Sequence, residues 1–176
     1  MFAFRSRRGC GTGKDGRVIR DATSADVDAI AELAEGRRAD YEMAHPQFWR
    51  RAVDAVEIHR PWLATMVSDA DVVSLVASGI DGELAGYAFA TVVPSPPVYD
   101  PGGTTGLVDD FQLADPDRWS TLGAELLAAV RERLAARGVV QLVVVCGQHD
   151  VAKRAALTAA GLSVASEWYV QPVEPQ

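Results

Sequence analysis

One short stretch of the chain combines residue types that can hold a phosphate group. Arg118 opens the run Arg-Trp-Ser-Thr-Leu-Gly, which ends at Gly123. The run follows turn formers around Pro116 and precedes a segment whose leucines recur at helical spacing. The first turn of a helix leaves backbone N–H groups unpaired and carries the positive end of the helix dipole. We therefore expect a phosphate or pyrophosphate to bind at residues 118–123.

Two adjacent carboxylates lie just upstream, in a stretch with the composition of a strand, residues 106–113. They are Asp109 and Asp110, and either one could accept the proton that an amine loses when it attacks an acyl group. Successive side chains of a strand point to opposite faces, so at most one of the two reaches a shared cleft. Two interpretations stay open: one of them is a catalytic base, or both are surface charges.

These residues need a scaffold, and the remaining pattern predicts a mixed α/β arrangement. Thr23 can cap a first helix, the pair Asp81-Gly82 is typical of a hairpin turn, and Gly138 is a typical helix stop. The expected strands cover residues 17–20, 72–80, 84–93, 106–113, 139–146 and 163–170, and the expected helices cover 24–34, 46–60, 122–137 and 151–160, with one or two separate helical turns at 62–67 after Pro61.

Composition and charge limit the class of protein. The 176 residues, 48% apolar and 23% charged, predict one domain at 17–171 between a flexible basic arm at 1–16 and a tail at 172–176. The net charge of −7 argues against nucleic acid as the main ligand. No apolar run approaches the ~20 residues of a membrane span, so no membrane partner is expected.

The cysteines predict the chemical environment. The chain has two, Cys10 and Cys146, which are far apart and have no metal-ligand partners at useful spacing. We therefore expect no disulfide framework, no metal site and a cytoplasmic location.

The order of strand, tight turn, helix and second strand around residue 118 resembles the acyl-CoA motif of the GCN5-related N-acetyltransferases, the GNAT family. That motif reads R/Q-x-x-G-x-G/A, and Arg118, Thr121 and Gly123 fall on its fixed positions, with threonine in place of the first glycine. The resemblance extends over residues 17–171. It implies an α/β fold with a GNAT-like mixed, mostly antiparallel sheet and helices on both faces. The sheet should splay between the strand of Phe111 and the strand that follows.

The resemblance also implies roles in the site, with acetyl-CoA as co-substrate. In the family, the strand before the motif binds the pantetheine arm through its backbone, and an asparagine opens the last helix where this chain has Asp150. The residues implied to bind the co-substrate are Phe111, Gln112, Leu113, Arg118, Trp119, Ser120, Thr121, Leu122, Gly123 and Asp150, with Asp109 or Asp110 as the base.

One family residue is absent from its usual place. The family's acid is a tyrosine four residues before the glycine that ends the last helix, and counting back from Gly161 gives Leu157. The departing thiolate would then take its proton from Cys146, His149, Tyr169 or solvent.

Two further groups of residues have alternative interpretations. Tyr41 and His45 either line a pocket for the acceptor or belong to ordinary packing, whereas the spacing of Phe48 and Trp49 favours burial. Lys153 lies where it could bind the 3′-phosphate of CoA, but a charge on a helix surface explains it better.

With the resemblance, the sequence predicts an N-acetyltransferase that transfers an acetyl group to a primary amine by direct attack in a ternary complex. The acceptor would be a small molecule or a protein N-terminus, and the acidic body of the chain suits a cationic one. The alternative, favoured by Thr121 and Leu157, is a catalytically silent CoA-binding domain with a regulatory or assembly role. A homodimer is compatible with both.

Overall fold

The fold is described by a computed structural model that covers residues 11–12, 18–79, 81–95 and 97–173. At its centre is an open sheet with the strand order β1-β2-β3-β4-β5-β6. Neighbouring strands run antiparallel except β5 and β6, which run parallel. The strands are β1 (Gly11–Thr12), β2 (Val18–Asp21), β3 (Val73–Ser78), β4 (Leu84–Val93), β5 (Thr105–Leu113) and β6 (Gln141–Val144).

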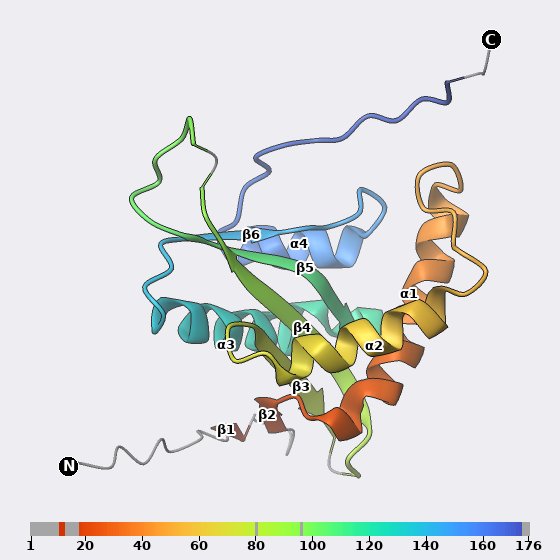
Figure 1. The fold of residues 1–176 in the computed structure, drawn as a ribbon, viewed down its shortest axis with the longest axis horizontal. Coiled ribbons are helices and arrows are strands. Elements are labelled where there is room, and N and C mark those ends of the chain that lie inside the picture. Colours follow the sequence, from red (N-terminus) through yellow and green to blue (C-terminus); the bar gives the residue numbers. More distant parts are fainter. Residues whose placement is uncertain (1–10, 13–17, 80, 96, 174–176) are drawn as a thin grey trace.

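Helices cover both faces of this sheet (Figure 1). The first two pack together on one face, and the last two pack on the other. They are α1 (Val27–Ala44), α2 (Ala55–Ser68), α3 (Ala124–Ala135) and α4 (Val151–Ala159). The predicted mixed, mostly antiparallel sheet with helices on both faces is therefore confirmed.

Each face of the sheet has its own apolar core, because successive strand side chains point to opposite faces. On the α1–α2 face, Leu63 of α2 packs with Tyr87 and Phe89 of β4, all without exposed surface. On the other face, Phe111 of β5 packs with leucines of α3 such as Leu126. Burial of such side chains stabilises a fold by about 1.5–3 kcal/mol each.

Two helices differ from their expected bounds. The second helix begins at Ala55 rather than after Pro46, and it continues through Pro61 to Ser68. A proline inside a helix removes one hydrogen-bond donor and usually breaks the helix. Here the fully buried Leu63 holds the C-terminal half against the sheet, so packing outweighs the local cost. Similarly, α1 continues past residue 34 to Ala44.

The sheet divides between its last two strands, as predicted. Only residues Thr105–Val108 of β5 pair with β6, so the half of β5 from Asp109 to Leu113 has no strand beside it on that edge. Where the division begins, Val108 and Asp109 together lie opposite one residue of β4, because Leu107 pairs with Thr91 and Asp110 with Phe89. This β-bulge bends the strand at the point where the neighbouring strand is lost.

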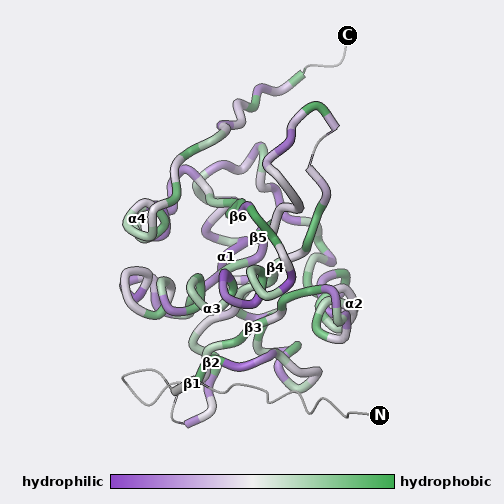
Figure 2. Tube along the Cα trace, turned by 90° about the vertical axis from the view of Figure 1, so that its left-hand side faces the viewer, coloured by the Kyte–Doolittle hydropathy of each residue, from purple (hydrophilic) through white to green (hydrophobic). Residues whose placement is uncertain are grey.

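The predicted last strand at 163–170 is wrong for this chain. After α4, Gly161 adopts a φ of +86°. Within the described residues, the segment that follows joins no strand of the sheet and runs away from it (Figure 1). Figure 2 shows hydrophobic stretches along this segment, and none of residues 163–173 belongs to either core.

The structure describes only parts of the two ends of the chain. Of the predicted arm at 1–16, Gly11–Thr12 form β1 and the remaining residues lie outside the described ranges, as do 174–176 of the predicted tail. Among the helices that are described, none is both long and apolar enough to cross a bilayer.

We predict that Gly86→Ala destabilises the β4–β5 pair. A Cβ at Gly86 would lie 2.5 Å from Cδ2 of Leu113 and 2.9 Å from the carbonyl oxygen of Gln112, so strand backbone would have to move. The free energy of unfolding, measured by urea denaturation, should fall by about 1–3 kcal/mol.

The matched control is Gly36→Ala in α1, where a Cβ would meet no atom within 4 Å. Alanine favours a helix over glycine, so this variant should gain about 0.5–1 kcal/mol. Equal effects at the two positions would contradict the packing described for β4 and β5.

Candidate active site

A buried arginine of α1 binds the strand that carries the two predicted carboxylates. Arg37 donates from its Nη1 to Oδ1 of Asp110 at 2.9 Å and from its Nη2 to the backbone carbonyl of Asp109 at 3.4 Å. A charge-assisted hydrogen bond of this kind is about twice as strong as a neutral one. The contact fixes α1 to β5 at the bulge.

One helical turn later, Tyr41 of α1 binds the opposite side of the division in the sheet. Its hydroxyl donates to Oδ2 of Asp150 at 2.8 Å and accepts from the backbone N–H of Gly147 at 3.1 Å. The guanidinium of Arg37 lies 4.8 Å from the centre of the Tyr41 ring. Because residues four apart share a helix face, one surface of α1 holds both sides of the division together.

Asp110 is surrounded by donors. Besides Arg37, the hydroxyl of Tyr87 donates to its Oδ1 at 2.7 Å, and Nε2 of His59 lies 3.4 Å from its Oδ2. Burial alone would raise the pKa of Asp110, but the hydrogen bond from His59 and the charge of Arg37 hold that pKa below its usual value. Asp110 is thus an ionised carboxylate that lies under α1, and both of its oxygens have partners. Asp109, by contrast, has an exposed side chain.

His59 extends this network towards α2. Its ring stacks on Trp62 with centroids 5.3 Å apart, and its Nδ1 lies 3.1 Å from Nη1 of Arg38. A guanidinium can only donate, so Nδ1 accepts and the ring proton belongs on Nε2, facing Asp110.

A second aromatic group lies where α1 ends. The rings of Tyr41 and Trp49 are 5.0 Å apart, and those of Phe48 and Trp49 are 4.5 Å apart. Tyr41 is buried, whereas His45 is exposed and Phe48 is 39% exposed. Phe48 and Trp49 lie in neither core, contrary to the burial that their spacing favoured.

The sequence did not predict the burial of the most unusual residue of the site. Lys153 of α4 has no exposed surface, and its ammonium donates to the backbone carbonyl of Phe111 at 2.9 Å. It lies 5.2 Å from the ring centres of both Phe111 and Trp119. Phe111 belongs to the half of β5 that has no strand beside it, so Lys153 satisfies a carbonyl that β6 leaves unpaired. The interpretation of Lys153 as a charge on the helix surface is wrong.

Burial controls the ionisation of this lysine. Transfer into the core disfavours the ammonium form and lowers the pKa of Lys153 to about 8, and the nearby charge of Arg37 acts in the same direction. A group with such a pKa exchanges its proton near physiological pH, which an ordinary lysine does not.

The motif residues form a π-helical turn, Trp119–Gly123, that leads directly into α3. Trp119, Leu122 and Gly123 are buried, while Ser120 and Thr121 are exposed. A Cβ at Gly123 would lie 2.6 Å from the Trp119 ring, so packing already requires glycine there. The groups that this turn offers to an anion are therefore the backbone and the hydroxyls of its exposed residues.

The other predicted co-substrate residues lie around the division. Phe111 and Leu113 place their side chains in the core, and Oε1 of Gln112 is buried with no hydrogen-bond partner among the described residues. Asp150 holds the N-cap position of α4, but its side chain makes no capping bond. It is the acceptor for Tyr41 instead.

The alternative acid candidates differ in their surroundings. Leu157 is buried in the core of the α3–α4 face. Cys146 is half-buried, and burial raises the pKa of its thiol. His149 packs edge-on against Tyr41, with ring centroids 4.6 Å apart. Tyr169 is 89% exposed on the segment after α4, where its hydroxyl donates to Glu167.

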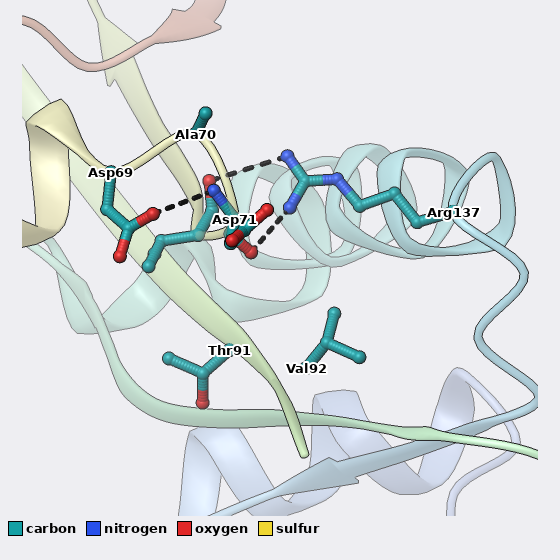
Figure 3. A pocket seen from close by; sticks show the side chains of 7 residues that line it. Asp69, Ala70, Asp71, Thr91, Val92 and Arg137 are labelled. Atoms are coloured by element: carbon teal, nitrogen blue, oxygen red, sulfur yellow. Dashed lines mark hydrogen bonds between the residues drawn. The ribbon is translucent and has the colours of Figure 1, made fainter. Parts of the chain in front are cut away.

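A hollow of about 610 Å³ lies elsewhere, at the far end of α3 (Figure 3). In it the guanidinium of Arg137 donates to the backbone carbonyls of Asp71 at 2.6 Å and Val72 at 3.5 Å. The twelve residues of α3, roughly 18 Å of helix, separate it from the Trp119–Gly123 turn. This hollow is not part of the candidate site, and no group of three His, Cys, Asp or Glu side chains in the described residues could hold a metal ion.

Comparison with known proteins shows which solved structures share this fold. The sequence matches no family model and no curated protein. A mutant of the BH1408 protein from Bacillus halodurans has a TM-score of 0.77 at 16% identity, over 89% of this chain and 99% of that one. A predicted acetyltransferase with acetyl-CoA from Clostridium acetobutylicum has a TM-score of 0.70 at 13% identity, over 89% of this chain and 96% of that one. The aminoglycoside antibiotic 6′-N-acetyltransferase AAC(6′)-Ih from Acinetobacter baumannii has a TM-score of 0.66 at 10% identity, over 92% of this chain and 100% of that one.

These likenesses define the architecture as that of the acetyltransferases. The divided sheet, the parallel pair β5–β6 and the helix order agree with it. The chain therefore has the GCN5-related N-acetyltransferase fold that the sequence resembles.

We predict that the buried lysine makes stability depend on pH. Lys153 holds its proton to higher pH when unfolded than when folded, so the unfolded chain binds more protons between pH 8 and 9.5. Stability must then rise with pH in this range, by about 2 kcal/mol for 1.5 pH units. Urea denaturation at several pH values measures it.

The comparison protein is Lys153→Met, which keeps the length of the side chain and removes the charge. It should be more stable than the natural chain at pH 7, and the difference should shrink as pH approaches 9.5. Parallel stability curves for the two proteins would show that the ammonium is not desolvated in the folded state.

Proposed function

We propose that the protein is an N-acetyltransferase that transfers an acetyl group from acetyl-CoA to a primary amine by direct attack in a ternary complex. The observation that carries this proposal is the unpaired half of β5, whose Phe111 carbonyl bonds to a side chain instead of a strand. A side chain can swing away more easily than a strand can detach. The carbonyl is then free to accept an amide N–H of the pantetheine arm.

The turn that precedes α3 supports the same proposal. Ser120 and Thr121 are exposed at the start of a helix, where backbone N–H groups and the helix dipole favour an anion. We assign the pyrophosphate of the co-substrate to this turn, with Arg118 beside it. The side chains of Trp119 and Leu122 then act through packing, by fixing the turn against the core.

Of the two predicted bases, we assign the role to Asp109. Asp110 is bonded to Arg37 and Tyr87 and has a lowered pKa, so it is a poor proton acceptor. Asp109 is exposed on the bulge, and within the described residues its carboxylate has no hydrogen-bond partner. It can attract a cationic amine and accept its proton, directly or through water. Asp110 is then a positioning residue that holds Arg37.

Lys153 can supply the proton that the departing thiolate needs. In the reaction, the amine nitrogen bonds to the acyl carbon, the carbon–sulfur bond breaks, Asp109 accepts the amine proton and the Lys153 ammonium protonates the sulfur. The products are an amide and a thiol. The pKa of Lys153, about 8, is close to the ~8.5 of an ordinary thiol, which suits proton transfer between them. This assignment places the acid one helical turn before Leu157.

The acceptor that fits best is a cationic primary amine, either a small molecule or a protein N-terminus. The net charge of −7 and the exposed Asp109 favour a cation. The aminoglycoside 6′-N-acetyltransferase named above is one protein of this fold that acts on an amine-bearing substrate.

A second candidate function rests on the same lysine. If Lys153 stays bonded to Phe111 when CoA is present, the thioester cannot reach the division, and the chain is a catalytically silent CoA-binding domain. Leu157 in place of tyrosine agrees with that role.

The first test is binding and turnover. With acetyl-CoA at about 100 times Kd, the folded state should gain about 2.7 kcal/mol, a melting shift of roughly 5–10 °C for a domain of this size. Thiol release should be stimulated by members of a primary-amine panel. A melting shift without thiol release supports the silent domain, and the absence of any shift rules out both candidate functions.

The second test separates the two proton transfers. Asp109→Asn should lower kcat/KM by about 10²–10⁴-fold and leave acetyl-CoA binding unchanged. With a peptide α-amine as acceptor, pKa about 7.7–8.0, the natural enzyme should lose rate above pH 8 as Lys153 loses its proton. That falling limb should be absent in Lys153→Met.

The control is Glu132→Gln, which removes one negative charge from the exposed side of α3 and should leave the rate unchanged. Full activity of Asp109→Asn would return the base to another group. A falling limb that persists in Lys153→Met would assign the acid to another group, such as the Cys146 thiol, whose pKa burial raises.

A further inference from the structure

The segment after α4 has the amino-acid composition of a strand, but it does not form one with the rest of the sheet. Residues 163–170 read Ser-Val-Ala-Ser-Glu-Trp-Tyr-Val, rich in β-branched and aromatic residues. Within the described part of the chain, this segment pairs with no strand. Its apolar side chains are exposed to solvent: Val164 is 69% exposed, Trp168 81%, Tyr169 89% and Val170 39%, and Val173 just beyond the segment is 92% exposed.

The sheet of the same chain ends in an unpaired strand. In the described residues β6 has one neighbour, β5, so its other edge has backbone N–H and C=O groups without strand partners. Apolar side chains are also exposed along it, at Val140, Val143 and Val145. Such an edge readily accepts an added strand.

The segment is directed away from the β6 edge of its own chain. The N–H of Leu162 bonds to the carbonyl of Leu157 and closes α4, and Gly161 turns the chain with a φ of +86°. Beyond this point the segment runs outward towards the α1–α2 connection, where the rings of Trp168 and Phe48 are 6.1 Å apart (Figure 1). One chain thus contains both the unpaired edge of β6 and the strand-like segment 163–170, and the two do not pair with each other.

We propose that two copies of the chain exchange these segments, so that residues 163–170 of each copy add a strand to the β6 edge of the other. One protein supplies both halves of the contact, and a two-fold axis satisfies both at once. The second copy is therefore the occupant that the observations favour over an unrelated strand. This proposal does not depend on the proposed enzymatic function.

The segment can supply a substantial part of the area that a dimer needs. A buried aromatic side chain contributes about 150–250 Å². Trp168 and Tyr169 point to opposite faces of an added strand, so one of them in each of two copies contributes about 300–500 Å². The valines of the segment and the β6 surface that it covers add to this value, towards the ~1,200 Å² of a specific interface. Eleven extended residues, 163–173, reach about 36–40 Å, which is enough to cross to a neighbouring molecule.

The experiment measures mass and contact in the full chain. Sedimentation equilibrium at micromolar concentration should give twice the mass of 18.8 kDa. Trp168→Ser combined with Tyr169→Ser should weaken the dimer at least about 100-fold, since aromatic residues dominate interface energies. Both side chains are exposed within the chain, so the thermal transition of the resulting monomer remains cooperative. Val53→Asp, at another fully exposed apolar residue, should leave the dimer intact.

Strand exchange is distinguished from simple face-to-face contact by cross-linking. A benzoylphenylalanine placed at position 168 should, on irradiation, join two copies, and the cross-linked peptide should contain residues 140–145. A monomer at every concentration, a dimer that survives the double substitution, or a cross-link that maps away from β6 would each overturn the proposal.

Discussion

The structure depends on one face of α1 that holds a divided sheet together. Arg37 bonds to Asp110 and to the backbone of β5 at its bulge, and Tyr41 bonds to the loop between β6 and α4. Neither strand can compensate for a loss of these contacts, because β5 and β6 share hydrogen bonds over only half of β5. A buried ion pair costs desolvation and rarely adds much net stability. Its value here is geometric, since it sets the width of the division in which Lys153 lies.

The burial of Lys153 is a consequence of that division. Separating two strands leaves carbonyl groups in the interior without partners, and each must find a donor. The donor at Phe111 is an ammonium enclosed by two aromatic rings, whose electron-rich faces partly offset the loss of water. The residual cost appears as the lowered pKa. A charge that is held in this way is both poorly solvated and replaceable by another N–H donor, and these two properties favour a site that opens to a ligand.

The sequence predicted the order of the elements well, because hydrophobic period and turn residues act locally. The Asp81-Gly82 hairpin, the capping box of Thr23 and Asp26 in the turn before α1, and the buried β3 all express such local signals. Partners distant in sequence carry no local signal. The burial of Lys153, the engagement of Asp110 by His59 and Arg37, and the packing role of Gly123 against Trp119 all depend on which elements meet in space. The continuation of α2 through Pro61 has the same origin, since tertiary packing overrides local preference.

The last strand shows a different limit of sequence interpretation. The β-branched and aromatic residues at 163–170 favour a strand, but composition does not say which sheet such a strand would join. In one chain the segment leaves α4 in a direction that does not return to β6, and its aromatic side chains remain in solvent. Exposed apolar area of this size is costly for a monomer and ordinary for an interface. The strand propensity that fails to predict the fold of one chain is the basis of the proposed exchange between two chains.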